Sequence, residues 1–131
     1  MKVGTDLEEL RRYLSVPPGV ASARFVVEAV AGAGDSFLPG PTDTRVYALL
    51  RPLVDGKEFE QAFGPSQGRQ TILISHEAAA ALFPDQELPA GDGDVAMSGA
   101  GLDASRFGSS FYRAGTALRV GNAVLVSAFT T

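Results

Sequence analysis

The chain has 131 residues, a formal net charge of −4 and a pI near 4.9. Hydrophobic residues make up 45% and charged residues 20%, so we expect residues 1–131 to form a single globular domain with its own core. Cysteine is absent and histidine occurs once, at His76, which excludes disulfides, thiolate zinc sites, iron–sulfur clusters and paired-histidine metal sites within one chain. We therefore expect no cofactor and no metal.

The distribution of charge bears on location and partners. The first residues carry charges instead of the apolar run of an export signal, and no stretch of 18 apolar residues follows, so we expect a cytoplasmic protein with no membrane contact. The acidic balance argues against nucleic acid and anionic lipid as partners. The balance is uneven, because residues 1–103 hold 8 basic and 15 acidic residues, whereas residues 104–131 hold three arginines and no acid.

The N-terminal third predicts a helix and two strands. Thr5-Asp6-Leu7-Glu8 has the order of a capping box, and Leu7, Leu10 and Leu14 share one face, so we expect a helix over residues 6–15. Apolar residues alternate in residues 20–31 and again in residues 44–54, which is typical of half-buried strands. The glycines and prolines of residues 32–43 predict a loop between them.

The middle of the chain alternates between helix and strand. Phe59, Ala62 and Phe63 recur with helical spacing before Gly64-Pro65, which predicts a helix over residues 56–63. A strand over residues 70–75 and an alanine-rich helix over residues 77–83 follow, with Ser75 as a candidate N-cap. Residues 44–54 and 70–75 could be joined in parallel through the first of these helices, so the pattern leaves a mixed sheet open.

The C-terminal third predicts an exposed acidic loop over residues 85–94 and a short strand over residues 94–98. Phe107, Phe111 and Ala114 have helical spacing after a possible cap at Asp103, but Gly108 weakens the prediction of a helix there. Two β-prone runs, residues 116–120 and 123–130, flank Gly121-Asn122, a pair suited to a two-residue hairpin turn. Together the elements predict an α+β fold. We expect a mostly antiparallel sheet of five to seven strands, two or three helices packed on one face, and a C-terminal β-hairpin.

Two glycine motifs are candidates for a phosphate site, and an acidic run is a candidate for a calcium site. Gly32-Ala33-Gly34 and Gly99-Ala100-Gly101 follow apolar runs, but neither leads into a helix suited to phosphate, so we interpret both as flexible turns. The acidic residues of the predicted loop lack the twelve-residue calcium pattern, so we interpret them as solvated. These residues are Asp85, Glu87, Asp92 and Asp94.

His76 is the candidate catalytic residue, because it lies between a strand end and a helix start and could act as a general base. The alternative is a surface or capping histidine. Ser109 and Ser110 lack the glycine pattern of a nucleophile elbow, so they add no serine triad.

Arginines and aromatic residues combine near the C-terminus in a pattern used to hold carboxylates and phosphates. The candidate ligand-binding residues are Arg106, Tyr112, Arg113 and Arg119, with Phe107 and Phe111 among them. The alternative is structural, since arginine stems cover apolar surface and their heads can pair with the nearby acids.

Three functions follow from this pattern. The first is a non-enzymatic binding module in which a sheet face or a hairpin edge binds a protein, a peptide, a second copy or a small anion. The second is a small cofactor-independent enzyme, similar in chemistry to isomerases and cyclases, with His76 or a buried acid as proton carrier. The third is a nucleic-acid binder, which would need residues 104–131 to form a continuous positive face.

Overall fold

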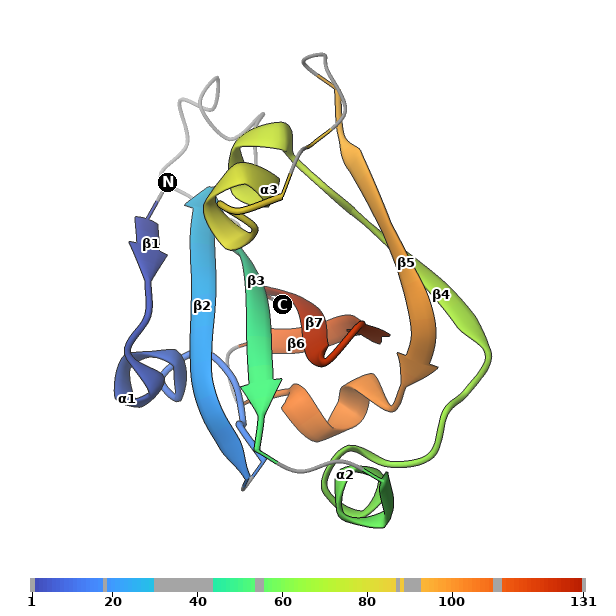
Figure 1. The fold of residues 1–131 in the computed structure, drawn as a ribbon. Coiled ribbons are helices and arrows are strands. Elements are labelled where there is room, and N and C mark those ends of the chain that lie inside the picture. The colour runs from blue at the N-terminus through green and yellow to red at the C-terminus, as the bar shows by residue number, and fades with distance from the viewer. Residues whose placement is uncertain are drawn as a thin grey trace.

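The computed structural model describes residues 2–17, 19–29, 44–53, 56–86, 88, 93–109 and 112–130. Seven strands form one open sheet in the order β1-β2-β3-β7-β6-β5-β4 (Figure 1). Every strand pairing in these ranges is antiparallel, which confirms the α+β expectation. The strands are β1 (Lys2–Gly4), β2 (Val20–Ala29), β3 (Thr44–Pro52), β4 (Arg69–Ile74), β5 (Val95–Leu102), β6 (Tyr112–Val120) and β7 (Ala123–Thr130).

Three α-helices and a 3-10 turn complete the described fold. They are α1 (Leu7–Leu10), α2 (Gly56–Phe63), α3 (His76–Leu82) and the 3-10 turn η2 (Ala104–Phe107). The predicted bounds of α2 are confirmed, and Ser75 and Asp103 act as N-caps as expected. The predicted loop over residues 32–43 lies outside the described residues.

The helix predicted over residues 6–15 is shorter than expected and begins from a different cap. Asp6, not Thr5, is the N-cap, and its carboxylate accepts from the Glu8 amide at 2.9 Å. After Leu10 the chain continues in turns, because the Ser15 amide donates to Phe107 O at 3.1 Å and draws the segment toward η2. Leu14 is still buried, so the apolar spacing was correct and the helical conformation was not.

Both faces of the sheet are buried. On β3, Val46, Ala48 and Leu50 contribute to one apolar cluster, whereas Tyr47 and Leu49 contribute to another. The first cluster also contains α1, α2 and η2, and we call this side the α1/α2 face. The second contains α3, and we call it the α3 face. The helices therefore lie on two faces, and the expectation that they pack on one face is corrected.

The sheet curves strongly, so that β4 and β5 lie across from β2 and β3 around the α3 face (Figure 1). The Tyr47 hydroxyl on β3 reaches Leu73 O on β4 at 3.3 Å, although the two strands are far apart in the sheet order. The mixed sheet that the sequence left open is not formed. Because β3 pairs with β2 and β7, the chain through α2 carries β4 to the far edge.

The C-terminal hairpin of β6 and β7 is confirmed, with Gly121 in the turn at a φ of 57°. It lies in the middle of the sheet, because β7 pairs with β3 and β6 pairs with β5. The hairpin therefore offers no free edge to a partner, and the exposed edges belong to β1 and β4 instead.

Gly99 and Gly101 are part of β5, so the interpretation of this motif as a flexible turn is wrong. A Cβ on Gly99 would lie 1.9 Å from Arg119 O, and one on Gly101 would lie 2.4 Å from Gln70 Cγ. The glycines therefore allow β5 to approach both neighbouring strands closely. The other glycine motif, residues 32–34, lies outside the described residues.

Candidate functional site

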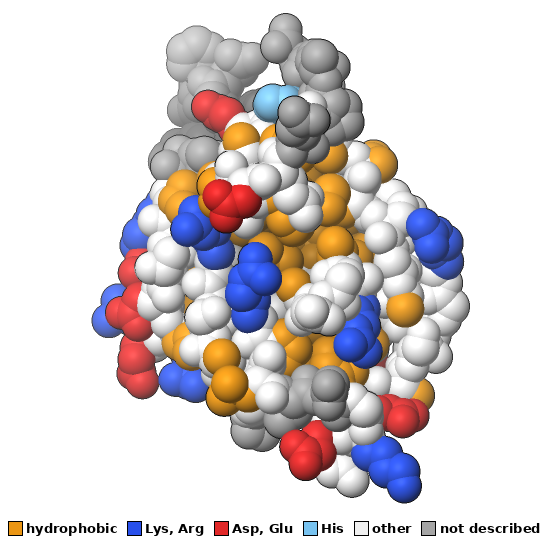
Figure 2. Space-filling model, in the orientation of Figure 1, with side chains coloured by type: hydrophobic (Ala, Val, Ile, Leu, Met, Phe, Trp, Pro, Cys, Tyr) orange, Lys and Arg blue, Asp and Glu red, His pale blue; other side chains and the backbone are white. Residues whose placement is uncertain are grey.

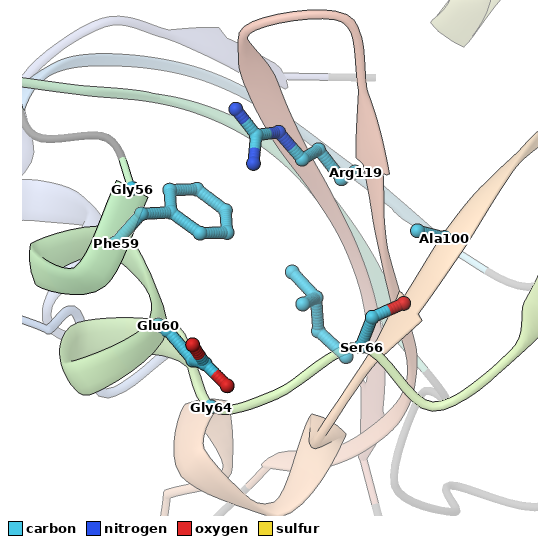
Figure 3. A pocket seen from close by; sticks show the side chains of 8 residues that line it. Gly56, Phe59, Glu60, Gly64, Ser66, Ala100 and Arg119 are labelled. Atoms are coloured by element: carbon cyan, nitrogen blue, oxygen red, sulfur yellow. The ribbon is translucent and has the colours of Figure 1, made fainter.

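A pocket of about 270 Å³ lies where α2 and the segment after it meet β5 and β6 (Figure 3). Its lining residues are Gly56, Phe59, Glu60, Gly64, Ser66, Ala100, Leu102 and Arg119. Half of them have small side chains, which leaves the space open. The volume lies near the lower limit for small-molecule sites, so the pocket suits a small ligand.

Arg119 is the basic side chain of this pocket. Its guanidinium carbon lies 4.2 Å from the centroid of the Phe59 ring, a cation–π contact, and its Nε donates to Gly121 O at 3.2 Å. Within the part of the chain that the structure describes, no carboxylate forms an ion pair with Arg119. The two contacts hold the guanidinium in place while its terminal nitrogens have no acidic partner there.

The other walls of the pocket are apolar or weakly polar. Phe59 and Leu102 are only 5% and 6% exposed, and both belong to the core cluster of the α1/α2 face. Figure 3 shows Arg119 on one side of the Phe59 ring and Glu60 on the opposite side of the opening. The arrangement can receive a small molecule with an anionic group at Arg119 and an apolar body against Phe59 and Leu102.

The structure does not bring the four predicted ligand-binding residues together. Arg106 lies against Gly64 but donates to Gln61 O at 3.3 Å and Ala62 O at 3.4 Å, so it binds carbonyls at the end of α2. Tyr112 packs edge-on against Tyr13 with centroids 5.4 Å apart, and burial raises its pKa. Of the four, Arg119 alone lines the described pocket.

Arg113 and Arg119 are six residues apart on β6, yet they lie on opposite faces. The register shifts between Ala114 and Thr116, so one extra residue enters the strand. Ala114 and Ala117 consequently both pack on the α1/α2 face, which reverses the alternation between the two arginines. A continuous basic face over residues 104–131 is not formed by the described arginines, and the basic side chains visible in Figure 2 are scattered among acidic and uncharged ones.

His76 lies away from this pocket, at the first residue of α3, and Figure 1 places α3 and α2 at opposite ends of the molecule. The neighbouring Ser75 hydroxyl accepts from the Ala78 amide at 3.1 Å and donates to Glu28 at 3.3 Å. The histidine is half-buried and has interactions of its own. His76 therefore lies where α3 contacts β2, beside the bond from Ser75 to Glu28.

A second polar network ties the α3 face together. Arg45 Nη1 donates to the Tyr47 hydroxyl at 3.2 Å, and that hydroxyl donates to Leu73 O at 3.3 Å. Burial raises the pKa of Tyr47, while the hydrogen bond from Arg45 opposes the shift. Because the Tyr47 side chain is 2% exposed and its hydroxyl is satisfied, this network serves to hold β3 and β4 together.

The described residues form neither a cluster suited to a metal ion nor a helix suited to a membrane. No group of three or more histidine, aspartate or glutamate side chains there could hold a metal ion. No described helix has the length and apolar character needed to cross a membrane. Of the acidic residues weighed in the sequence, Glu87 and Asp92 lie outside the described ranges, as does Phe111 among the aromatic residues.

Sequence reasoning named Arg119 but missed the residues that surround it. Phe59 and Phe63 were expected only as core positions of a helix, and nothing local indicates that Phe59 meets an arginine sixty residues later. Comparison with protein-family models, curated proteins and solved structures found no match. The pocket beside Arg119 is therefore the observation from which a function can be inferred.

Proposed function

We propose that this protein is a non-enzymatic binding module that holds a small anionic molecule with an apolar body in the pocket beside Arg119. The observation that carries the proposal is the guanidinium stacked on Phe59 at 4.2 Å with no acidic partner among the described residues. A cytoplasmic location belongs to the same proposal.

The chemistry of Arg119 favours a planar anion. A guanidinium presents paired N–H donors that match a carboxylate, and a charge-assisted pair of this kind is about twice as strong as a neutral hydrogen bond. Stacking on Phe59 and the bond from Nε to Gly121 O reduce the freedom that the side chain would lose on binding. Phe59 and Leu102 supply the apolar wall for the rest of the ligand.

Binding is favoured over catalysis by the composition of the pocket wall. A general acid or base must lie within hydrogen-bond reach of the reacting group. Among the lining residues Glu60 is the one carboxylate, and His76 belongs to the α3 face instead. The cofactor-independent enzyme therefore stands second, with Glu60 in place of His76 as its proton carrier.

The test is an NMR titration with phenylacetate, compared with phenylacetamide as the neutral analogue of the same shape. We expect phenylacetate to shift the amide signals of residues 56–66, 100–102 and 119, and phenylacetamide to bind at least tenfold more weakly. Arg119→Gln should weaken phenylacetate binding about tenfold or more for the same reason.

Arg113→Gln is the matched control, because it removes the same charge from the same strand on the opposite face. It should leave the affinity for phenylacetate unchanged, and thermal unfolding should show that both variants are folded. Equal weakening by the two variants, equal binding of the acid and the amide, or signal changes confined to other regions would each refute the proposal.

A further inference from the structure

The two edges of the sheet differ in how well they are protected from pairing with another chain. The edge strand β1 has three residues, and its Lys2 forms an ion pair with Glu9 of α1. The opposite edge strand, β4, has six residues and carries a single charge, on Arg69 at its start. Short length and lysine are ordinary protections of an edge, and β4 has neither.

The side chains of β4 are exposed over residues 69–71 and alternate between buried and exposed from Thr71 to Ile74. Arg69, Thr71 and Leu73 are exposed, and Leu73 is 59% exposed although it is a large apolar residue. Their partners on β5 are Ala100, Ser98 and Ala96, which are small and also exposed. The outer surface beside β4 therefore consists mostly of small uncharged side chains, with Leu73 projecting from it and Arg69 as its one charge on the strand.

The backbone of β4 has an unused side in the described structure. It pairs with β5 and lies at the end of the strand order. The Tyr47 hydroxyl donates to Leu73 O of this strand, and a carbonyl oxygen can accept a second bond. The Thr71 hydroxyl is bonded to the Ser98 hydroxyl of β5 at 2.8 Å, which leaves the backbone of Thr71 available. Such an edge can extend its ladder by adding a strand.

We infer that the β4 edge pairs with the β4 edge of a second copy of this chain, antiparallel and centred on Thr71. Residues opposite each other in a ladder point to the same face of the sheet. The two-fold symmetry must therefore place one residue opposite its own copy in the second chain, not opposite a sequence neighbour. Centring on Thr71 places Thr71 against itself and Leu73 beside Arg69 of the second copy. It also keeps the chain beyond Ile74, where α3 begins, outside the paired stretch.

The charges of β4 favour this occupant. In the proposed register the two Arg69 residues are four positions apart along the ladder, about 13 Å, which exceeds the screening length of about 8 Å at physiological salt. No other charge lies on the strand, so no like-charged pair opposes the contact. The apolar part of each Arg69 covers a Leu73, and the two threonines meet at the axis.

The contact is small, so the dimer should be weak and dependent on concentration. Because the chain has no cysteine, single-cysteine variants can report the register. Under mild oxidation at high concentration, Thr71→Cys should form a covalent dimer rapidly. Leu73→Cys should not, because its two copies would lie about 13 Å apart, beyond the roughly 7 Å limit between Cα atoms for a disulfide.

Leu53→Cys controls for random collision, since Leu53 is 76% exposed and lies outside the sheet edge. Sedimentation of the cysteine-free protein gives a second readout. Leu73→Lys places a lysine beside Arg69 of the second copy and should abolish concentration-dependent association, whereas Leu53→Lys should preserve it.

A protein that stays monomeric at every concentration, or Thr71→Cys dimers that form no faster than those of Leu53→Cys, would overturn the inference. So would association that survives Leu73→Lys, or an edge occupied only by an extended peptide from another protein. The inference is independent of the pocket, because Arg119→Gln leaves the β4 edge unchanged.

Discussion

The two faces of the sheet are buried by different chemistry. The α1/α2 face is packed by aromatic rings, with Phe63 lying 4.7 Å from Phe59 and 6.1 Å from Phe107 between ring centroids. The α3 face is packed mostly by aliphatic side chains, including Ala78 and Ala79 of the helix, with Tyr47 and Phe83 as its buried aromatic members. Hydrogen bonds donated by Tyr47 to Leu73 O and by Ser75 to Glu28 tie its helix and strands together.

This difference explains where the pocket forms. An alanine-rich helix can approach a sheet closely and leave little space beneath it. At the margin of the α1/α2 face, Phe59 meets small residues and Arg119 instead of another large side chain. The aromatic face therefore combines a large part of the core with the candidate site, whereas the α3 face is mainly structural.

The comparison is tested most strongly by Phe63→Ala. Phe63 is fully buried between two other rings, so we expect the free energy of unfolding to fall by about 3–5 kcal/mol. Urea denaturation measures the change, and Leu53→Ala at an exposed position is the control. A loss below about 1 kcal/mol would show that the aromatic cluster does not dominate this face.

A smaller effect is expected from Ser75→Ala on the α3 face. The variant removes the N-cap of α3 and the bond to Glu28, so the free energy of unfolding should fall by about 1 kcal/mol. Hydrogen exchange should become faster at the first amides of α3 and stay unchanged in α2. Ser75→Thr retains a capping hydroxyl and should recover most of the loss, and equal loss in both variants would contradict the capping role.

An effect of similar size concerns Tyr47, and its distinguishing feature is a dependence of stability on alkaline pH. Burial raises the pKa of Tyr47 above its usual value of 10.0, so the unfolded chain releases this proton at lower pH than the folded chain. The stability contributed by the neutral phenol is therefore complete below pH 10.0 and is lost as the pH rises through the pKa of the folded state.

Between about pH 9 and pH 11, the free energy of unfolding of Tyr47→Phe should therefore fall less with rising pH than that of the unsubstituted protein, as measured by urea denaturation. Near neutral pH the substitution should lower the free energy of unfolding by about 1 kcal/mol relative to the unsubstituted protein, the usual net contribution of one hydrogen bond. Tyr112→Phe is the comparison variant, because the pKa of Tyr112 is also raised. Identical alkaline slopes with and without the Tyr47 hydroxyl would refute this account.

Elements with a strong local signal could be predicted closely from the residues. Helix 56–63 has the expected bounds, the turn at Gly121 joins the expected hairpin, and Ser75 caps the expected helix. Periodicity failed where contacts from distant residues compete with it. The helix over residues 6–15 ends at Leu10 because Ser15 bonds to η2, which lies more than ninety residues later.

The candidate site was predictable only in part. Arg119 was singled out by its place in a segment that combines basic and aromatic residues, and Arg113 was grouped with it for the same reason. The bulge between Ala114 and Thr116 separates them; Gly115 lies at this position, but the strand was expected to begin only at Thr116, so the glycine was not interpreted as a bulge. Phe59 was identified only by its helical spacing and Leu102 was not singled out, since an apolar residue gives the same pattern whether or not a pocket adjoins it.

Spacing along the chain was enough to identify strands, helices and caps, because each depends on residues within a few positions of one another. Strand order, the division of helices between two faces and the meeting of Arg119 with Phe59 required the folded molecule. These features depend on contacts between distant segments, and the same alternating pattern is compatible with many such arrangements. One inserted residue in β6 was sufficient to exchange the faces of its two arginines.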